Sequence, residues 1–194
     1  MKQISDLEQR IRDYVNNANL YENHFKNHLD EWMALCVAMD TLEDSCQALE
    51  YYEDSGIGNE IGEKYLKLYG LLQAIFLQQD SICQLYLIFQ GECLQLDTDS
   101  AWKKIRALRN LTVGHPIERN KAGTKRCFIS QVSLSTHDFQ LQIWDKNKGQ
   151  AKSEDVDLKS LYEAYKSEAV KHLEKIHQAQ IGFLKKVESK NKKN

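Results

Sequence analysis

The sequence predicts a mainly helical, all-α protein that carries one small β-hairpin. Apolar side chains recur at spacings of three and four over most of its 194 residues, which is the spacing of one helix face. Helix-breaking residues are few, since the chain has only 9 glycines and 1 proline. One segment, 127–145, changes to a spacing of two, which is typical of strands. We therefore expect a single antiparallel helical bundle over 1–187 with a hairpin insertion, followed by a basic, disordered tail at 188–194.

The apolar pattern predicts two helices before residue 54. Their apolar positions are Ile4, Leu7, Ile11, Tyr14 and Val15 for the first, and Phe25, Leu29, Trp32, Met33, Cys36, Val37, Met39 and Leu42, on towards Leu49, for the second. Two glycines among polar neighbours then predict a loop at about 54–59. The segment from Ile61 to Phe89 is apolar around much of its helical circumference, so we expect it to form the centre of the core.

The second half of the chain contains the predicted hairpin and one long helix. Alternating apolar and β-branched residues predict strands over 127–134 and 138–145, joined by a short polar turn. The polar stretch 145–157 contains no such alternation and is predicted to be a loop. From Leu158 to Leu184 the helical spacing returns, which predicts a long amphipathic helix.

Composition indicates an ordinary globular protein, with 42% hydrophobic and 28% charged residues. No apolar run approaches the roughly 20 residues that a membrane-spanning helix needs, and the first residues lack the apolar stretch of a signal peptide. We therefore expect a cytoplasmic protein with no membrane partner. The 5 cysteines form no C-x-x-C pair, and we expect them to be reduced structural thiols.

Charge is unevenly distributed along the chain. Residues 1–100 carry 6 basic and 18 acidic side chains, a net charge of −12, whereas 101–126 carry 8 basic and 1 acidic, a net charge of +7. Residues 127–194 carry 12 basic and 9 acidic side chains, a net charge of +3. The central excess suggests an anionic ligand such as RNA or a nucleotide. The alternative is that this basic segment packs against the acidic first half.

The basic segment begins on a predicted helix. One of the polar residues at 97–100 can cap its first turn, and we expect it to end near Gly114. At about 100° per residue, Arg109 lies inside or at the margin of the apolar stripe. The residues on the more open side are Lys103, Arg106 and Asn110. A guanidinium beside apolar surface must be paired, or must face a cleft that anions can enter.

The only proline follows a histidine at the end of this helix. Gly114 permits the backbone to turn, and the residue before Pro116 is biased away from helical geometry. The break can therefore bring the imidazole of His115 over the helix end, beside the guanidinium of Arg109. The simpler alternative is a helix stop with a hydrogen-bonded histidine.

The run of Arg109, Asn110, four further residues and His115 resembles the signature of HEPN domains, an all-helical superfamily named for higher-eukaryote and prokaryote nucleotide binding. In that signature a polar residue follows an arginine, and a histidine comes after a gap of four to six residues. The resemblance extends loosely over 1–120 and the final helix, and it makes the hairpin an insertion. It implies metal-independent endoribonuclease activity by a homodimer in which two motifs share one composite groove.

The resemblance also implies roles for the three residues. His115 would shuttle a proton during attack of a ribose 2′-hydroxyl on the neighbouring phosphate, and Arg109 would stabilise the developing charge. Asn110 would orient the imidazole or hydrogen-bond the substrate. The expected products end in a 2′,3′-cyclic phosphate and a 5′-hydroxyl, and neither a cofactor nor a metal ion is expected. Contacts to the RNA backbone are expected from Lys103, Lys104, Arg106, Arg119, Lys125 and Arg126.

Partners follow from the same resemblance, which suggests a toxin–antitoxin system or phage defence, with an antitoxin or another regulatory protein as a second class of partner. Many such toxins carry a modified tyrosine two residues after the histidine, but Ile117 stands there, so control by that modification is not expected. Two alternatives stay open. One is a non-catalytic module that binds RNA, a nucleotide or a protein, and the other is a structural interaction protein.

Two further patterns have simpler interpretations. His24 and His28 lie one helical turn apart with Glu31 nearby, a spacing that could hold a metal ion, but a pair of surface histidines is expected. Several tyrosines recur at helical spacing, and we expect them to pack rather than to stack on bases. These tyrosines are Tyr51, Tyr52, Tyr65, Tyr69 and Tyr86.

Overall fold

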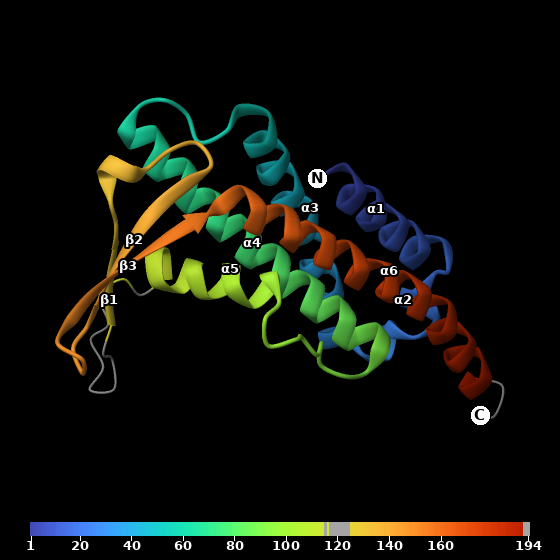
Figure 1. Ribbon diagram of the computed structural model, residues 1–194. Helices are drawn as coiled ribbons and strands as arrows, with labels where there is room; N and C mark the ends of the chain where they lie inside the picture. Colours follow the sequence, from blue (N-terminus) through green and yellow to red (C-terminus); the bar gives the residue numbers. More distant parts are fainter. Residues whose placement is uncertain (115, 117–124, 192–194) are drawn as a thin grey trace.

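The computed structural model describes the backbone of residues 1–114, 116 and 125–191, and the side chains of 1–114, 116 and 126–183. Within these residues a bundle of helices has a three-stranded sheet at one end (Figure 1), which confirms the mainly helical prediction. The elements are α1 (Lys2–Asn17), α2 (Leu20–Asn23), α3 (Leu29–Ser55), α4 (Ile61–Gln90), α5 (Ala101–Arg109), a π-helical turn (Asn110–Gly114), β1 (Lys125–Ile129), β2 (Asp138–Asp145), β3 (Gln150–Asp157) and α6 (Leu158–Asn191).

Helix α4 is the central helix of the bundle, as its apolar circumference predicted. It packs along α3 and also contacts α5 and α6. Leu68, Leu72, Ile75, Ile82 and Leu85 are each at most 1% exposed. Helix α6 crosses the bundle from the sheet to the opposite end and packs against α1 as well as α4 (Figure 1). Burial of each such side chain stabilises the fold by about 1.5–3 kcal/mol, so the contacts of α4 and α6 hold the bundle together.

The predicted hairpin is confirmed, because β1 pairs with β2 in antiparallel register, with Cys127 opposite Ile143. The core-facing side chains Phe139, Leu141 and Ile143 alternate along β2 and are at most 7% exposed. Strand β3 pairs with the other edge of β2, which corrects the predicted loop over 145–157. Its sequence is polar and mostly exposed, so no apolar alternation marks it, and backbone hydrogen bonds to β2 hold it in place.

The second helical pattern differs in detail from its prediction. Phe25 is buried but lies in a short 3₁₀ turn, and α3 begins only at Leu29. Leu29, Met33 and Val37 are spaced by four and are between 57% and 59% exposed. The core-facing stripe of α3 runs instead through buried residues such as Leu35. The sequence pattern therefore combined two apolar faces, and the bundle covers only one of them.

The ends of two other elements also differ from expectation. Strand β1 ends at Ile129, short of the predicted residue 134, and a 3₁₀ turn follows it. Helix α6 includes 188–191 of the segment expected to form a disordered tail, while 192–194 lie outside the described residues. Among the helices that the structure describes, none combines the length and the apolar character needed to cross a membrane.

Candidate functional site

The first turn of α5 is fixed by polar side chains from two sides. Ser100 caps the helix, since its hydroxyl accepts a hydrogen bond from the backbone N–H of Lys103 at 3.2 Å. The carboxylate of Glu168, on α6, accepts from the backbone N–H groups of Ala101 and Trp102 at 2.8 and 3.0 Å. A negative charge at this helix end also suits the helix dipole. The cap at Ser100 was among those predicted, whereas the contribution of Glu168 depends on a contact between distant segments.

The apolar stripe of α5 lies as the sequence predicted. Trp102, Ile105 and Leu108 are at most 6% exposed, and Arg109 is half-buried at the edge of the stripe. Arg106 differs from its prediction, because it is also half-buried rather than on the open side. Its guanidinium carbon lies 4.2 Å from the ring centre of Phe76 on α4, and this aromatic surface draws the side chain inwards. The exposed side of α5 therefore carries fewer free cations than expected.

Arg109 is held by neutral groups. Its Nε and Nη2 donate to Oε1 of Gln73 on α4, at 3.1 and 2.8 Å. Its Nη1 donates to Oδ1 of Asn110 at 3.1 Å, and its guanidinium carbon lies 4.1 Å from the ring centre of Phe76. Among the described residues no carboxylate pairs with it. The side chain is thus oriented while its positive charge is not cancelled, which suits an anionic ligand.

Gly114 leaves room for this guanidinium. A β-carbon at residue 114 would lie 2.7 Å from Nη1 of Arg109. Gly114 has no left-handed backbone conformation, so the backbone freedom predicted for it is not what the structure uses. Its small size instead leaves space for the guanidinium of Arg109. The backbone from Asn110 to Gly114 forms a π-helical turn, and such turns occur frequently at functional sites. The motif therefore distorts the helix end and packs its backbone against the arginine.

The neighbouring Arg106 differs from Arg109, because an ion pair cancels its positive charge. Nη1 of Arg106 forms an ion pair with Oδ1 of Asp80 at 2.8 Å and donates to Oε1 of Gln79 at 3.3 Å. It contacts the same ring of Phe76 as Arg109 does. Of these two arginines, only Arg109 keeps its charge available to a ligand.

The structure brings together only part of the predicted site. Arg106 and Arg109 both contact Phe76, and Asn110 is hydrogen-bonded to Arg109. The ammonium of Lys103 turns away and donates to the carbonyl of Leu96 at 2.8 Å. Lys104 and Arg126 are exposed. His115 and Arg119 lie outside the described residues, as does the side chain of Lys125. The sequence did not reveal Gln73 or Phe76, because nothing in the pattern of α4 pairs them with arginines 30 to 36 residues away.

A groove of ≈ 520 Å³ lies between α4, the π-helical turn and β1, on the side of Pro116. The backbone N–H of Cys127 donates to the carbonyl of Pro116 at 3.0 Å, which ties the residue after His115 to the sheet. The lining residues are Tyr65, Tyr69, Thr112, Pro116, Arg126, Cys127, Phe128 and Ile129. Burial raises the pKa of the Cys127 thiol to about 11, so it lies in this groove as a neutral thiol rather than a nucleophile at neutral pH.

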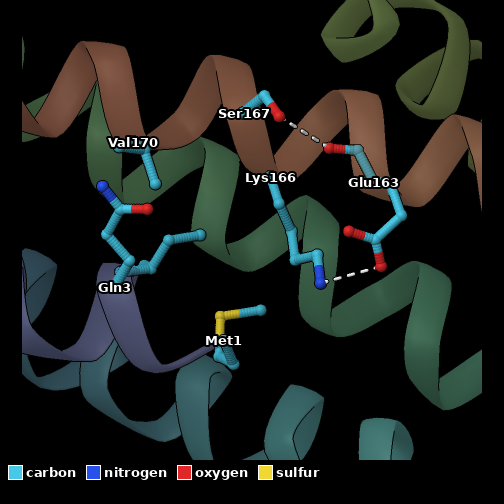
Figure 2. Close-up of a pocket in the computed structure, with 7 residues that line it drawn as sticks. Met1, Gln3, Glu163, Lys166, Ser167 and Val170 are labelled. Atoms are coloured by element: carbon cyan, nitrogen blue, oxygen red, sulfur yellow. Dashed lines mark hydrogen bonds and ion pairs between the residues drawn. The ribbon is translucent and has the colours of Figure 1, made fainter.

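A second hollow, of ≈ 340 Å³, lies between the N-terminal residues and α6 (Figure 2). Its charged side chains are paired with one another. Lys166 lies 2.9 Å from Glu163 and 2.7 Å from Glu53, and the amino group of Met1 also pairs with Glu53. Figure 2 shows Lys166 turned toward Glu163 inside the hollow. These mutual ion pairs leave little charge for a ligand, so we regard this hollow as structural.

The histidine pair lies just before and at the start of α3, close to Glu31. The rings of His24 and His28 stack with centroids 4.9 Å apart, and Nδ1 of His28 lies 3.9 Å from a carboxylate oxygen of Glu31. No group of three or more metal-binding side chains occurs in the part of the chain that the structure describes.

Comparisons of the chain with protein-family models, with curated proteins and with solved structures found no match. Membership of the HEPN superfamily therefore remains a prediction from the motif.

Proposed function

We propose that the protein is a metal-independent endoribonuclease of the HEPN type. The observation that carries this proposal is the arrangement of Arg109, which is oriented by Gln73 and Asn110 but keeps its positive charge. His115 follows six positions after Arg109 in the sequence. An oriented cation and a proton-shuttling group are what cleavage of a phosphodiester requires.

The proposed reaction is a transesterification within the RNA. His115 takes the proton of a ribose 2′-hydroxyl, the 2′-oxygen bonds to phosphorus, and the bond from phosphorus to the 5′-oxygen breaks. The leaving 5′-oxygen takes up a proton from water, and the imidazolium of His115 returns its proton to water, so the products end in a 2′,3′-cyclic phosphate and a 5′-hydroxyl. Arg109 stabilises the extra negative charge on the phosphorane, and the carboxamide of Asn110 holds one arm of the guanidinium.

Homodimerisation belongs to the same proposal. An exposed apolar stripe on α3, with Met33 and Val37, borders a hollow of ≈ 400 Å³ that Leu77 and Asp80 of α4 also line. Asp80 is the ion-pair partner of Arg106, so this apolar surface adjoins Arg106, which shares the ring of Phe76 with Arg109. Packing a second copy there would remove apolar surface from water and would place two motifs near one interface.

A non-catalytic RNA-binding module is the second candidate. The groove beside the motif favours it, because its aromatic side chains and Arg126 could hold a nucleotide without any proton transfer. Binding of RNA that survives His115→Ala, without cleavage by either protein, would select this function. Absence of both cleavage and binding would instead leave a structural interaction protein.

The test of the nuclease is cleavage of total and transfer RNA in EDTA by the wild type and by His115→Ala and Arg109→Ala. His137→Ala, which alters an exposed histidine of the β1–β2 connection, is the matched control. We expect cleavage by the wild type and the control, and a loss of about 10²–10⁴-fold in His115→Ala. The products should accept 5′-labelling by a kinase without prior phosphatase treatment. Undiminished cleavage by His115→Ala, or cleavage that EDTA abolishes, would contradict the proposal.

A further inference from the structure

We propose that the groove between α4 and β1 binds unpaired bases of single-stranded RNA, with Tyr69 and Phe128 as its stacking surfaces. The inference rests on the proposed function, because it provides a seat for the nucleotides next to the phosphate at Arg109. It also assigns a role to the sheet, which is the part of the fold that a plain helical bundle lacks.

The two rings face water although both are large and apolar. Tyr69 is 39% exposed on α4, and Phe128 is 66% exposed on β1. They come from separate elements and line one groove of ≈ 520 Å³, a volume within the range of small-ligand sites. The ring of Tyr65 lies 5.9 Å from that of Tyr69 and supports it from within. Aromatic rings of this kind stack on any base, because every base has a π-face.

Helical spacing predicted that Tyr65 and Tyr69 are both packing residues, but this holds only for Tyr65. Tyr65 is half-buried, and its hydroxyl donates to the carbonyl of Ile129 at 3.5 Å, as befits a packing residue. No hydrogen bond of this kind engages Tyr69 among the described residues, and its ring pairs with that of Tyr65. The exposed ring of Tyr69 is therefore the one available to a base.

Charge around the groove complements a nucleic-acid backbone. Arg126 lines the groove, two residues before Phe128 on the same exposed face of β1. Tyr69 lies one helical turn from Gln73, which holds Arg109, so the groove leads toward that guanidinium. None of the described lining residues is acidic. A strand of RNA can thus place its bases in the groove and its phosphates beside two arginines.

A polypeptide added to the edge of β1 is the competing occupant, and the backbone of β1 argues against it. The N–H of Cys127 on that edge already donates to the carbonyl of Pro116, at 3.0 Å. The carbonyl of Ile129 accepts from the hydroxyl of Tyr65. Strand addition needs these groups free, whereas base stacking needs only the exposed rings.

The test is fluorescence anisotropy with an unstructured ten-nucleotide 2′-O-methyl RNA, which cannot be cleaved through its 2′-oxygen. Tyr69→Ala and Phe128→Ala should each weaken binding by about 5- to 150-fold, the loss typical of one stacking side chain. Tyr51→Ala is the matched control, because Tyr51 is a 64% exposed tyrosine on α3 that lies outside the groove, and it should change the affinity less than about twofold. Phe128→Trp keeps a ring at residue 128 and should bind as the wild type does.

The salt dependence separates stacking from charge. Arg126→Ala should reduce the slope of log Kd against log salt by roughly 0.7, whereas Tyr69→Ala should leave the slope unchanged. Equal affinities of the wild type, Tyr69→Ala and Phe128→Ala would overturn the proposal that the groove binds bases. Cleavage in EDTA would in that case still support the nuclease. Binding through the groove by a protein that cleaves no RNA would uphold the groove and overturn the nuclease. Absence of RNA binding by the wild type at low salt, including the case in which the groove takes a polypeptide, would overturn the inference.

Discussion

Two glutamines of α4, Gln73 and Gln78, hold polar groups in different surroundings. Gln78 is fully buried, accepts from the hydroxyl of Tyr165 at 2.9 Å, and lies 3.4 Å from Oγ of Ser45 and Sγ of Cys46. Gln73 is half-buried at the end of the bundle near the sheet, and its carbonyl oxygen accepts twice from Arg109. The two side chains are five residues apart and so point about 140° apart around the helix.

Gln78 stabilises the fold, whereas Gln73 orients a side chain of the candidate site. Around Gln78 every partner is neutral and water is excluded, so each hydrogen bond compensates the burial of another polar group. Around Gln73 the partner is a cation, and a neutral acceptor orients it without cancelling its charge. Substitutions at these two positions should therefore change different properties of the protein.

The largest effect is expected on stability at the buried position. Gln78→Ala removes the partner of the Tyr165 hydroxyl and leaves a cavity, so it should lower the free energy of unfolding by about 3 kcal/mol. Gln73→Ala should lower it by less than about 1 kcal/mol, because water can reach the freed guanidinium. Urea denaturation of both variants measures this, and equal losses would remove the contrast between the two regions.

Gly114→Ala should act on activity rather than on stability. The new β-carbon would displace the guanidinium of Arg109, and a misplaced catalytic group costs about 10- to 100-fold in rate. The free energy of unfolding should change by less than about 1 kcal/mol, because the residue has no left-handed backbone conformation. Gly70→Ala is the matched control, since a β-carbon there would meet no atom within 4 Å. Cleavage by Gly114→Ala at the wild-type rate would show that the close packing is not needed.

The smallest effect is expected from His172, which packs against the buried end of α5 with its ring 5.3 Å from that of Trp102. Burial, and then Lys175, lower the pKa of His172 below its usual value of 6.5, and its Nδ1 has no hydrogen-bond partner among the described residues. Below pH 6.5 the unfolded chain therefore binds more protons at this residue than the folded one. The stability that the neutral imidazole contributes is complete above that pH and is lost as the pH falls through the folded pKa.

Replacing this histidine tests that assignment. His172→Gln should show a smaller loss of stability between pH 7 and pH 5 than the wild type does, as measured by urea midpoints at each pH. An unchanged pH dependence would mean that other groups account for it.

Much of the fold could be predicted from the sequence, because the apolar face of a helix or hairpin appears as a regular spacing of residues close together in the chain. The apolar stripe of α5 predicted that Arg109 would lie at its margin, and the alternation at Phe139 and Leu141 predicted β2. Strand β3 could not be predicted in this way, because an exposed edge strand shows no apolar alternation. The support of Arg109 by Gln73 and Phe76 depends on helix packing between distant segments, which periodicity does not encode.

Arg109 offers a positive charge that no carboxylate among the described residues cancels. Gln73→Glu tests whether this free charge is needed, because it keeps the shape of the side chain and places a carboxylate on the guanidinium. Gln90→Glu is the matched control, since it adds the same charge to an exposed position of α4 seventeen residues away. Both variants are to be compared with the wild type for RNA cleavage in EDTA and for the free energy of unfolding.

We predict that Gln73→Glu loses about 100-fold or more in the rate of RNA cleavage, with the free energy of unfolding changed by less than about 1 kcal/mol. Gln90→Glu should cleave at close to the wild-type rate. Cleavage by Gln73→Glu as fast as by the wild type would contradict the claim, because Arg109 would then act equally well with its charge cancelled.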